Sequence, residues 1–166
     1  SLFGDKIKAR SLAQSLDIPI VPGSTEPLVS HSEAAELARD LGYPVMLKAS
    51  AGGGGRGMRV VESAEDMAEA FERSRSEAEA AFGDGSLFVE KLIARPRHIE
   101  VQVLADSHGN VVHLYERDCS VQLRNQKVVE VAPAPALDAA QRERILADAV
   151  KLVRTAKYVN AGTVEF

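Results

Sequence analysis

The sequence predicts an α+β fold in which helices flank antiparallel strands. Three observations lead to this prediction. Apolar residues recur at helical spacing in four separate segments, and short runs rich in valine, isoleucine and leucine lie between them. The polar stretch 106–110, which contains Gly109, joins two of these runs in the way that a tight turn joins an antiparallel hairpin.

The four helical segments carry start and stop signals at their ends. They span residues 4–16, 30–42, 63–83 and 138–158. Ser30 and Glu33 have capping-box spacing at the start of the second helix, and Gly42 ends that helix. We expect the third helix to start at Ser63 and the fourth at Asp138, each with its apolar residues on one face.

Seven strands are predicted between and after the helices. They span residues 44–49, 58–62, 86–92, 98–106, 111–118, 121–131 and 162–166. The strand at 98–106 alternates, which predicts one apolar face and one polar face. The apolar positions are Ile99, Val101 and Val103, and the polar positions are His98, Glu100 and Gln102. Residues 132–138, APAPALD, resemble a linker, and we expect the last helix and strand after it to belong to another sheet.

Composition excludes several classes of protein. With 166 residues, 45% of them apolar, the chain can bury roughly two thirds of its unfolded surface as one domain or slightly more. No apolar run approaches the roughly 20 residues of a membrane span, and the N-terminus lacks the apolar core of a signal peptide, so we expect a cytoplasmic protein, or a mitochondrial-matrix protein in a eukaryote. A net charge of −4 with scattered basic residues argues against DNA or RNA as a partner. Cys119 is the single cysteine, which excludes an internal disulfide and a cysteine-rich zinc site.

The stretch VMLKASAGGGGRGMRV, residues 45–60, contains five glycines between two predicted strands. Gly52, Gly54 and Gly57 match the dinucleotide fingerprint G-x-G-x-x-G, but a strand follows this loop where that fingerprint opens a helix. A Walker A loop would need Gly-Lys-Ser/Thr, and a protein kinase places its glycine loop before the lysine strand rather than after it. The run therefore predicts a flexible loop beside Lys48 whose amide groups close over an anionic ligand such as a triphosphate.

Four further motifs occur along the chain. They are FGDK at 3–6, EKLIARPRHIEVQV at 90–103, ERDCSVQLRNQKVVEVAPAP at 116–135 and NAGTVEF at 160–166. Together with the glycine loop they make nearly the whole chain resemble the ATP-grasp region of the biotin carboxylase component of biotin-dependent carboxylases. The resemblance implies an ATP-grasp lid subdomain with an antiparallel sheet and flanking helices, followed by the start of the C-terminal ATP-grasp subdomain. The implied boundaries are 1–22 for a lead-in helix and connection, 23–92 for the lid and 93–166 for the incomplete C-terminal subdomain.

The resemblance also implies a ligase reaction. ATP and bicarbonate give carboxyphosphate and ADP, and the carboxyl group then passes to N1 of biotin on a carrier domain. The implied cofactors are ATP and Mg²⁺ or Mn²⁺, and biotin is a carried substrate that is not attached here, because no Ala-Met-Lys-Met sequence occurs. The implied partners are bicarbonate, the biotin carboxyl carrier domain and a carboxyltransferase domain or subunit, with no nucleic acid and no membrane. We expect the chain itself to be monomeric, because biotin carboxylases dimerise through regions outside this lid.

By resemblance, the first half of the chain supplies ATP contacts. Lys6 and Lys48 match lysines that neutralise the phosphates. Glu90 and the backbone from Lys91 to Ile93 match the hinge that holds adenine. The glycine-rich lid folds over the nucleotide and excludes water. The lid residues are Gly52, Gly53, Gly54, Gly55, Arg56, Gly57 and Met58.

The second half, again by resemblance, supplies the ribose, metal and phosphoryl-transfer contacts. His98, Gln122 and Asn125 match positions near the ribose and phosphates. Lys127 matches a lysine that faces the phosphoryl transfer and bicarbonate, and is the candidate catalytic residue. Glu165 matches one of the carboxylates that bind the magnesium bridging the phosphates.

Two features depart from the family pattern. Many relatives read Gln-Arg-Arg-His-Gln-Lys where this chain has Leu123 and Asn125, and asparagine can bond a ribose hydroxyl but carries no charge. Asn125 favours the acyl-CoA carboxylases, whereas KYVNAGTVEF is also close to pyruvate carboxylases, so the final acceptor stays open. The chain also stops one residue after Glu165, before the family's segment EMN-R-QVEH with the second metal carboxylate, the bicarbonate arginine and the base. We therefore expect an incomplete catalyst and leave its own ATP binding open.

Two other functions also stay open at this point. Another ATP-grasp ligase, such as carbamoyl-phosphate synthetase or a purine-biosynthesis carboxylase, shares the strand-loop-strand lid and acyl-phosphate chemistry. Comparing biotin with ammonia or glutamine as the acceptor would separate these enzymes. A non-catalytic nucleotide-binding or interaction module would suit a chain that functions as it stands, without the base and the second metal ligand.

Overall fold

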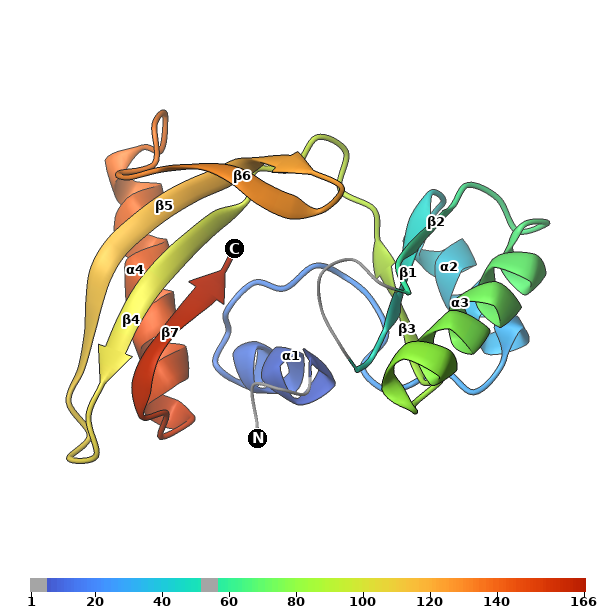
Figure 1. Cartoon of the computed structure of the whole chain (residues 1–166), viewed down its shortest axis with the longest axis horizontal. Helices are drawn as coiled ribbons and strands as arrows, with labels where there is room; N and C mark the ends of the chain where they lie inside the picture. The colour runs from blue at the N-terminus through green and yellow to red at the C-terminus, as the bar shows by residue number, and fades with distance from the viewer. Residues whose placement is uncertain (1–5, 52–56) are drawn as a thin grey trace. The chain divides into compact units, whose positions relative to one another are not determined.

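The computed structural model describes residues 6–51 and 57–166, with side chains from Lys8 onward. Contacts between residues divide the chain into two compact units, 1–94 and 95–166, and each is described by itself (Figure 1). Each unit contains one antiparallel sheet, with α2 (His31–Leu41) and α3 (Met67–Phe82) packed on the first sheet and α4 (Ala139–Thr155) on the second. The predicted α+β fold class is thereby confirmed.

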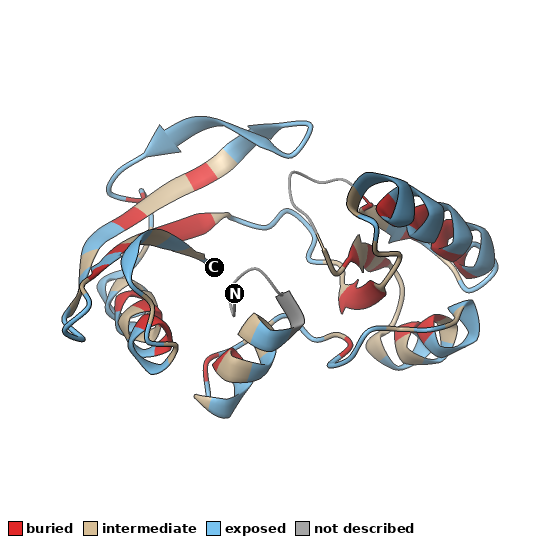
Figure 2. Ribbon diagram, turned by 60° about the horizontal axis from the view of Figure 1, so that its bottom comes forward, coloured by how far each residue is buried: buried red, intermediate tan, exposed pale blue. Residues whose placement is uncertain are grey.

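The first unit holds a three-stranded sheet in the order β2-β1-β3. Its elements are α1 (Lys6–Ser15), α2 (His31–Leu41), β1 (Val45–Ala49), β2 (Arg59–Val61), α3 (Met67–Phe82) and β3 (Leu87–Lys91). Alternate β1 residues, such as Val45 and Leu47, are fully buried against α2 and α3, and Figure 2 shows the buried stripes of both helices turned toward the sheet. Met46 and Lys48 consequently lie on the sheet face that these helices leave uncovered.

Of the two helix starts predicted in this unit, one agrees with the structure and one does not. The predicted cap of α2 is confirmed, because the Ser30 hydroxyl accepts a hydrogen bond from the Glu33 amide at 3.2 Å. The predicted start of α3 at Ser63 is wrong, and the helix begins at Met67. The Ser63 hydroxyl instead donates to the Asp66 carboxylate at 2.8 Å, so it closes the turn that precedes the helix rather than capping helical amides.

The second unit holds a four-stranded sheet in the order β6-β5-β4-β7, with α4 on one face. Its elements are β4 (Ile99–Ala105), β5 (Val111–Leu123), β6 (Gln126–Val131), α4 (Ala139–Thr155) and β7 (Asn160–Glu165). The expectation that the last helix and strand belong to another sheet is wrong, because β7 pairs antiparallel with β4. Val101 and Val103 on β4 need an apolar cover, and α4 supplies it with Ala149 and Val153.

Both hairpins of this sheet end in tight turns. The predicted hairpin between β4 and β5 is confirmed, and the Asp106 carboxylate accepts from the Asn110 amide at 2.9 Å across its turn. The single strand expected at 121–131 is wrong. Residues 121–123 extend β5, and Arg124 and Asn125 form a turn with φ of 51° and 63° before β6.

A buried carboxylate ties the segment before α4 to the sheet. Glu116 on β5 is fully buried, and its carboxylate accepts from Arg142 Nε at 2.8 Å and from the Ala134 amide at 3.2 Å. Arg142 also donates to the Ala134 carbonyl at 3.1 Å. Burial alone would raise the pKa of Glu116, but the hydrogen bonds and the Arg142 charge lower it. Within the described part of the chain, none of the helices is long and apolar enough to cross a membrane.

Candidate functional site

In the first unit, a lysine and a glutamate predicted to bind ATP meet on the sheet face opposite α2 and α3. Lys48 on β1 forms an ion pair with Glu90 on β3, and Arg10 from α1 bonds the same carboxylate. Glu90 retains only 8% exposure, and both cations contact its carboxylate. The side chain of Lys6 lies outside the described residues. Unit 1 therefore presents Lys48 already oriented by Glu90.

The glycine-rich loop connects β1 and β2 as predicted. The two strands pair antiparallel, with Leu47 opposite Arg59, which confirms a strand-loop-strand arrangement in place of a dinucleotide fingerprint. Gly52, Gly53, Gly54, Gly55 and Arg56 lie outside the described residues. Gly57 has φ of +68°, and a Cβ there would lie 3.0 Å from the Ala49 Cβ, so this position requires glycine. Met58 follows it, half-buried, at the entry to β2.

Lys91, at the end of β3, is held by the turn that precedes β1. Its Nζ lies 2.7 Å from the Gly42 carbonyl oxygen and 3.4 Å from that of Pro44. The Lys91 amide donates to the Pro22 carbonyl at 2.8 Å, so side chain and backbone are both fixed. Ile93 follows, 48% exposed. The chain thus leaves β3 in a defined direction at the segment predicted to hold adenine.

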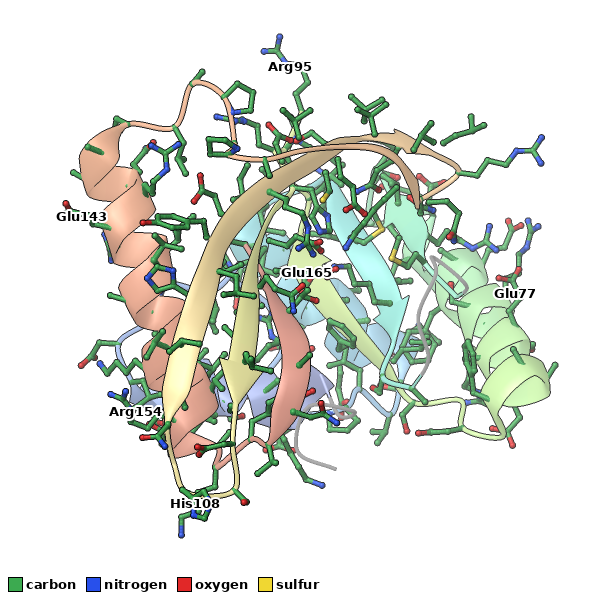
Figure 3. The ribbon with its side chains drawn as sticks, turned by 60° about the vertical axis from the view of Figure 1, so that its left-hand side comes forward. Glu77, Arg95, His108, Glu143, Arg154 and Glu165 are labelled. Carbon is green, nitrogen blue, oxygen red and sulfur yellow. The ribbon has the colours of Figure 1, made fainter. Side chains whose placement is uncertain are left out.

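In the second unit, sheet register gathers a charged cluster on the face opposite α4. Glu100 on β4 stands opposite Arg117 on β5 and opposite Glu165 on β7. Glu100 is 2% exposed, and its carboxylate is bonded by both Arg117 and Lys127. Lys127 Nζ also lies 3.0 Å from Glu165 Oε1. Figure 3 shows Glu165 on the face of the sheet away from α4.

The charges in this cluster stabilise one another. Burial alone would raise the pKa of Glu100, but hydrogen bonds from Lys127 and Arg117 outweigh it and lower the pKa. Burial alone would lower the pKa of Lys127, whereas its hydrogen bonds to Glu100 and Glu165 raise it. The Lys127 ammonium is therefore permanently charged at neutral pH, and it stands between two carboxylates.

His98 and Gln122, both predicted near the ribose and phosphates, touch each other beside this cluster. His98 Nε2 lies 3.3 Å from Glu165 Oε1, and Gln122 Nε2 lies 3.1 Å from His98 Nδ1. Asn125 is exposed in the turn between β5 and β6. The sheet therefore brings His98, Gln122, Lys127 and Glu165 together, whereas Asn125 lies at the hairpin tip.

Sequence reasoning missed two members of the cluster. Alternation predicts only that Glu100 lies on a polar face, and no sequence pattern indicates a role for Arg117. The alternation at 98–103 contained the signal for Glu100, because it puts Glu100 on the face that carries His98. The partnership of Glu100 with Arg117 depends on strand register, which the sequence pattern does not specify.

Carboxylates, a histidine and the cysteine form two possible ligand sets among the described residues. In the first, His98, Glu100 and Glu165 bring ligand atoms within 4.8 Å of one another, and in the second Glu100, Cys119 and Glu130 do so. Burial raises the pKa of the Cys119 thiol, and the charges of Glu100 and Glu130 raise it further. A neutral buried thiol is a poor nucleophile.

Comparisons with known proteins agree along almost the entire chain. The family model described as the carbamoyl-phosphate synthase L chain, ATP-binding domain, matches residues 5–166. Pyruvate carboxylase 1 of Caenorhabditis elegans is 62% identical over 164 residues, and human mitochondrial pyruvate carboxylase is 56% identical over 164 residues. Each alignment covers 99% of this chain and 14% of the relative, so the chain spans about a seventh of the length of these curated relatives.

Solved structures give the same result. A biotin carboxylase from Campylobacter jejuni, in a beta-gamma-ATP complex, superposes with a TM-score of 0.96 at 51% identity, covering 98% of this chain and 36% of that one. The biotin carboxylase domain of the Hydrogenobacter thermophilus 2-oxoglutarate carboxylase, solved with MgADP, ADP and bicarbonate, superposes with a TM-score of 0.95 at 48% identity. That alignment covers 99% of this chain and 36% of the neighbour.

Proposed function

The chain belongs to the family of carbamoyl-phosphate synthase L chain ATP-binding domains, and on that premise we propose that it is the ATP-binding part of a biotin carboxylase. The observation that carries this proposal is the superposition, at a TM-score of 0.96, on a biotin carboxylase solved with an ATP ligand. In the proposed reaction a bicarbonate oxygen takes the γ-phosphoryl group of ATP, which yields carboxyphosphate and ADP. The carboxyl group then passes to N1 of biotin on a carrier domain, and a carboxyltransferase uses it.

The residues of the first unit would bind the adenine and phosphates. Lys48 is positioned by the Glu90 carboxylate and would pair with phosphate oxygens, together with amide groups of the glycine-rich loop. Since the Lys91 amide donates to Pro22 and the Leu92 amide donates to Pro44, Ile93 would offer adenine the next amide along the chain. Lys6 would add a second positive charge near the phosphates.

The residues of the second unit would hold the metal and the group being transferred. Lys127 keeps its charge at neutral pH because Glu100 and Glu165 bond it, and it would stabilise the charge on the transferring phosphoryl group. Mg²⁺ prefers oxygen ligands, and the carboxylates of Glu165 and Glu100 fit that preference. When bound, the metal neutralises phosphate charge. Gln122 and Asn125 would bond the ribose or the phosphates.

The parent protein would carboxylate pyruvate. This part of the proposal is supported by pyruvate carboxylases from animals, fungi and Staphylococcus aureus that are 53–62% identical to the chain. An acceptor assay on the parent protein tests it, with pyruvate, acetyl-CoA, propionyl-CoA and 2-oxoglutarate compared at equal concentrations. A preference for an acceptor other than pyruvate would contradict it and leave the biotin carboxylase step intact.

Two measurements test the ATP-binding proposal. Calorimetric titration of the 166-residue chain with MgATP should show binding that Lys48→Met weakens roughly 10- to 100-fold, because a hydrogen bond to a charged group contributes about 1.5–3 kcal/mol. Lys157→Met removes an exposed lysine as the matched control and should leave the affinity unchanged. The parent protein should cleave ATP in a bicarbonate-dependent manner. An ATP cleavage rate that is the same with and without bicarbonate would refute the proposed reaction.

The family description favours one alternative, a carbamoyl-phosphate synthase in which ammonia replaces biotin as the acceptor. Both reactions begin with the same phosphorylation of bicarbonate. Incubating the parent protein with ATP and labelled bicarbonate, with either free biotin or ammonia, distinguishes them. Labelled carboxybiotin supports the proposal, and labelled carbamoyl phosphate supports the alternative.

A further inference from the structure

The His98 imidazole lies where it could join a metal site. Its Nε2 is 3.3 Å from Glu165 Oε1, and its ligand atom lies within 4.8 Å of those of Glu100 and Glu165. Imidazole is a preferred ligand of Zn²⁺ and related transition metals, whereas Mg²⁺ takes oxygen ligands. If the His98 ring can coordinate a metal, the cluster favours Zn²⁺ or a related metal. If it cannot, the cluster favours Mg²⁺.

Gln122 determines which nitrogen of His98 carries the proton. Its Nε2 lies 3.1 Å from the Cys119 carbonyl oxygen and 3.1 Å from His98 Nδ1. Because a carbonyl oxygen only accepts, the Gln122 atom that faces it must be the amide nitrogen, which carries two hydrogens and accepts none. The second hydrogen points to His98 Nδ1, so Nδ1 is an acceptor. A neutral imidazole with Nδ1 as acceptor carries its proton on Nε2.

This tautomer is the wrong one for metal binding. A coordinating nitrogen needs a free lone pair, and a metal-bound histidine normally donates its other N–H to a carboxylate, carbonyl or water. Here the other nitrogen faces a donor, and Nε2 carries a hydrogen. Among the described residues, Nε2 is buried without a hydrogen-bond partner, although Glu165 Oε1 is 3.3 Å away. The N–H is therefore available to an oxygen acceptor and not to a cation.

We propose that Gln122 is a positioning residue that biases metal specificity, because it favours the Nε2–H tautomer of His98 and thereby disfavours imidazole as a ligand. The carboxylate oxygens of Glu100 and Glu165 remain, and they suit Mg²⁺. The inference rests on the proposed function, which gives the cluster its metal. Gln122 is exposed, so one hydrogen bond would bias the tautomers roughly tenfold rather than completely.

The tautomer can be measured directly. The ¹⁵N NMR spectrum of the histidine rings, recorded on the 166-residue chain at alkaline pH where imidazoles are neutral, should show His98 as the Nε2–H form. Gln122→Glu replaces the donor with an acceptor, and the spectrum should change toward the Nδ1–H form. Gln122→Met removes the donor without adding charge and should populate both forms. Gln126→Glu adds the same charge to the same hairpin and should leave the Nε2–H form in place.

Metal titrations provide the second readout. Gln122→Glu should bind Zn²⁺ roughly 10-fold more tightly than the wild type, the effect expected of a changed partner behind a ligating histidine. Its Mg²⁺ affinity should change no more than in Gln126→Glu, and adding His98→Ala should abolish the gain in Zn²⁺ affinity. An Nδ1–H form in the wild type, or equal Zn²⁺ affinities of Gln122→Glu and Gln126→Glu, would overturn the inference. Neither readout requires ATP or turnover, so this failure is distinguishable from a failure of the proposed function.

Discussion

Replacing Lys127 with methionine tests whether the buried carboxylate of Glu100 depends on two cations. Glu100 is 2% exposed and is bonded by Lys127 and Arg117. Removing one partner of a buried ion pair costs about 3–5 kcal/mol. Because Arg117 stays in place and the Lys127 side chain is itself 29% exposed, we expect the free energy of unfolding to fall by about 2 kcal/mol at neutral pH.

Urea denaturation followed by circular dichroism measures this loss as a shift in midpoint at constant slope. The pKa of Glu100 is lowered from 4.5 in the folded state, so its ion pairs stabilise the fold above pH 4.5 and cease to do so as the pH falls through the folded-state pKa. The difference between wild type and Lys127→Met should therefore be largest at neutral pH and smaller at an acidic pH below 4.5.

Two comparisons make this prediction refutable. Lys157→Met, at an exposed position of the same unit, should change stability by less than about 0.5 kcal/mol. A double-mutant cycle of Lys127→Met with Glu100→Gln should give a coupling of at least about 1.5 kcal/mol. A Lys127→Met loss no larger than that of Lys157→Met, and equal at both pH values, would show that the pair behaves like an exposed ion pair and would refute the reasoning.

Three further substitutions test the surrounding structure. Arg142→Ala leaves the fully buried Glu116 carboxylate without its charged partner and should lower the free energy of unfolding by about 3 kcal/mol in urea, so a loss below about 1 kcal/mol would contradict the ion pair's role. Hydrogen bonding lowers the pKa of Asp118 from 3.8 to about 2, so the wild type should lose about 2 kcal/mol as the pH falls through this range, and identical acid-denaturation curves for Asp118→Asn would contradict that contribution. In Gly23→Ala the new Cβ would lie 2.4 Å from the Val89 carbonyl oxygen, and the melting temperature should drop by an amount equivalent to about 1–3 kcal/mol; an unchanged melting temperature would mean that the backbone moves apart without cost.

Much of the fold could be predicted because its signals are local. Alternation at 98–103 correctly placed Val101 in the core and Glu100 on the polar face, since successive strand residues point to opposite sides. The Ser30 cap and the Gly42 stop correctly bounded α2, since a cap is made within one helical turn. The predicted helix start at Ser63 was wrong because the Ser63 hydroxyl donates to the Asp66 carboxylate instead of accepting from a helical amide.

The sequence by itself determined which way the side chains of residues 98–103 face, and that a glycine-rich loop joins β1 to β2. Only the tertiary structure decided that Lys127 stands between Glu100 and Glu165, and that Gln122 aims its amide at His98. It also decided that the final helix and strand return to the sheet of β4. The physical reason is that periodicity depends on neighbouring residues, whereas strand register is set by backbone hydrogen bonds between segments far apart in the chain. A register shift of one residue would turn every side chain of the strand to the other face.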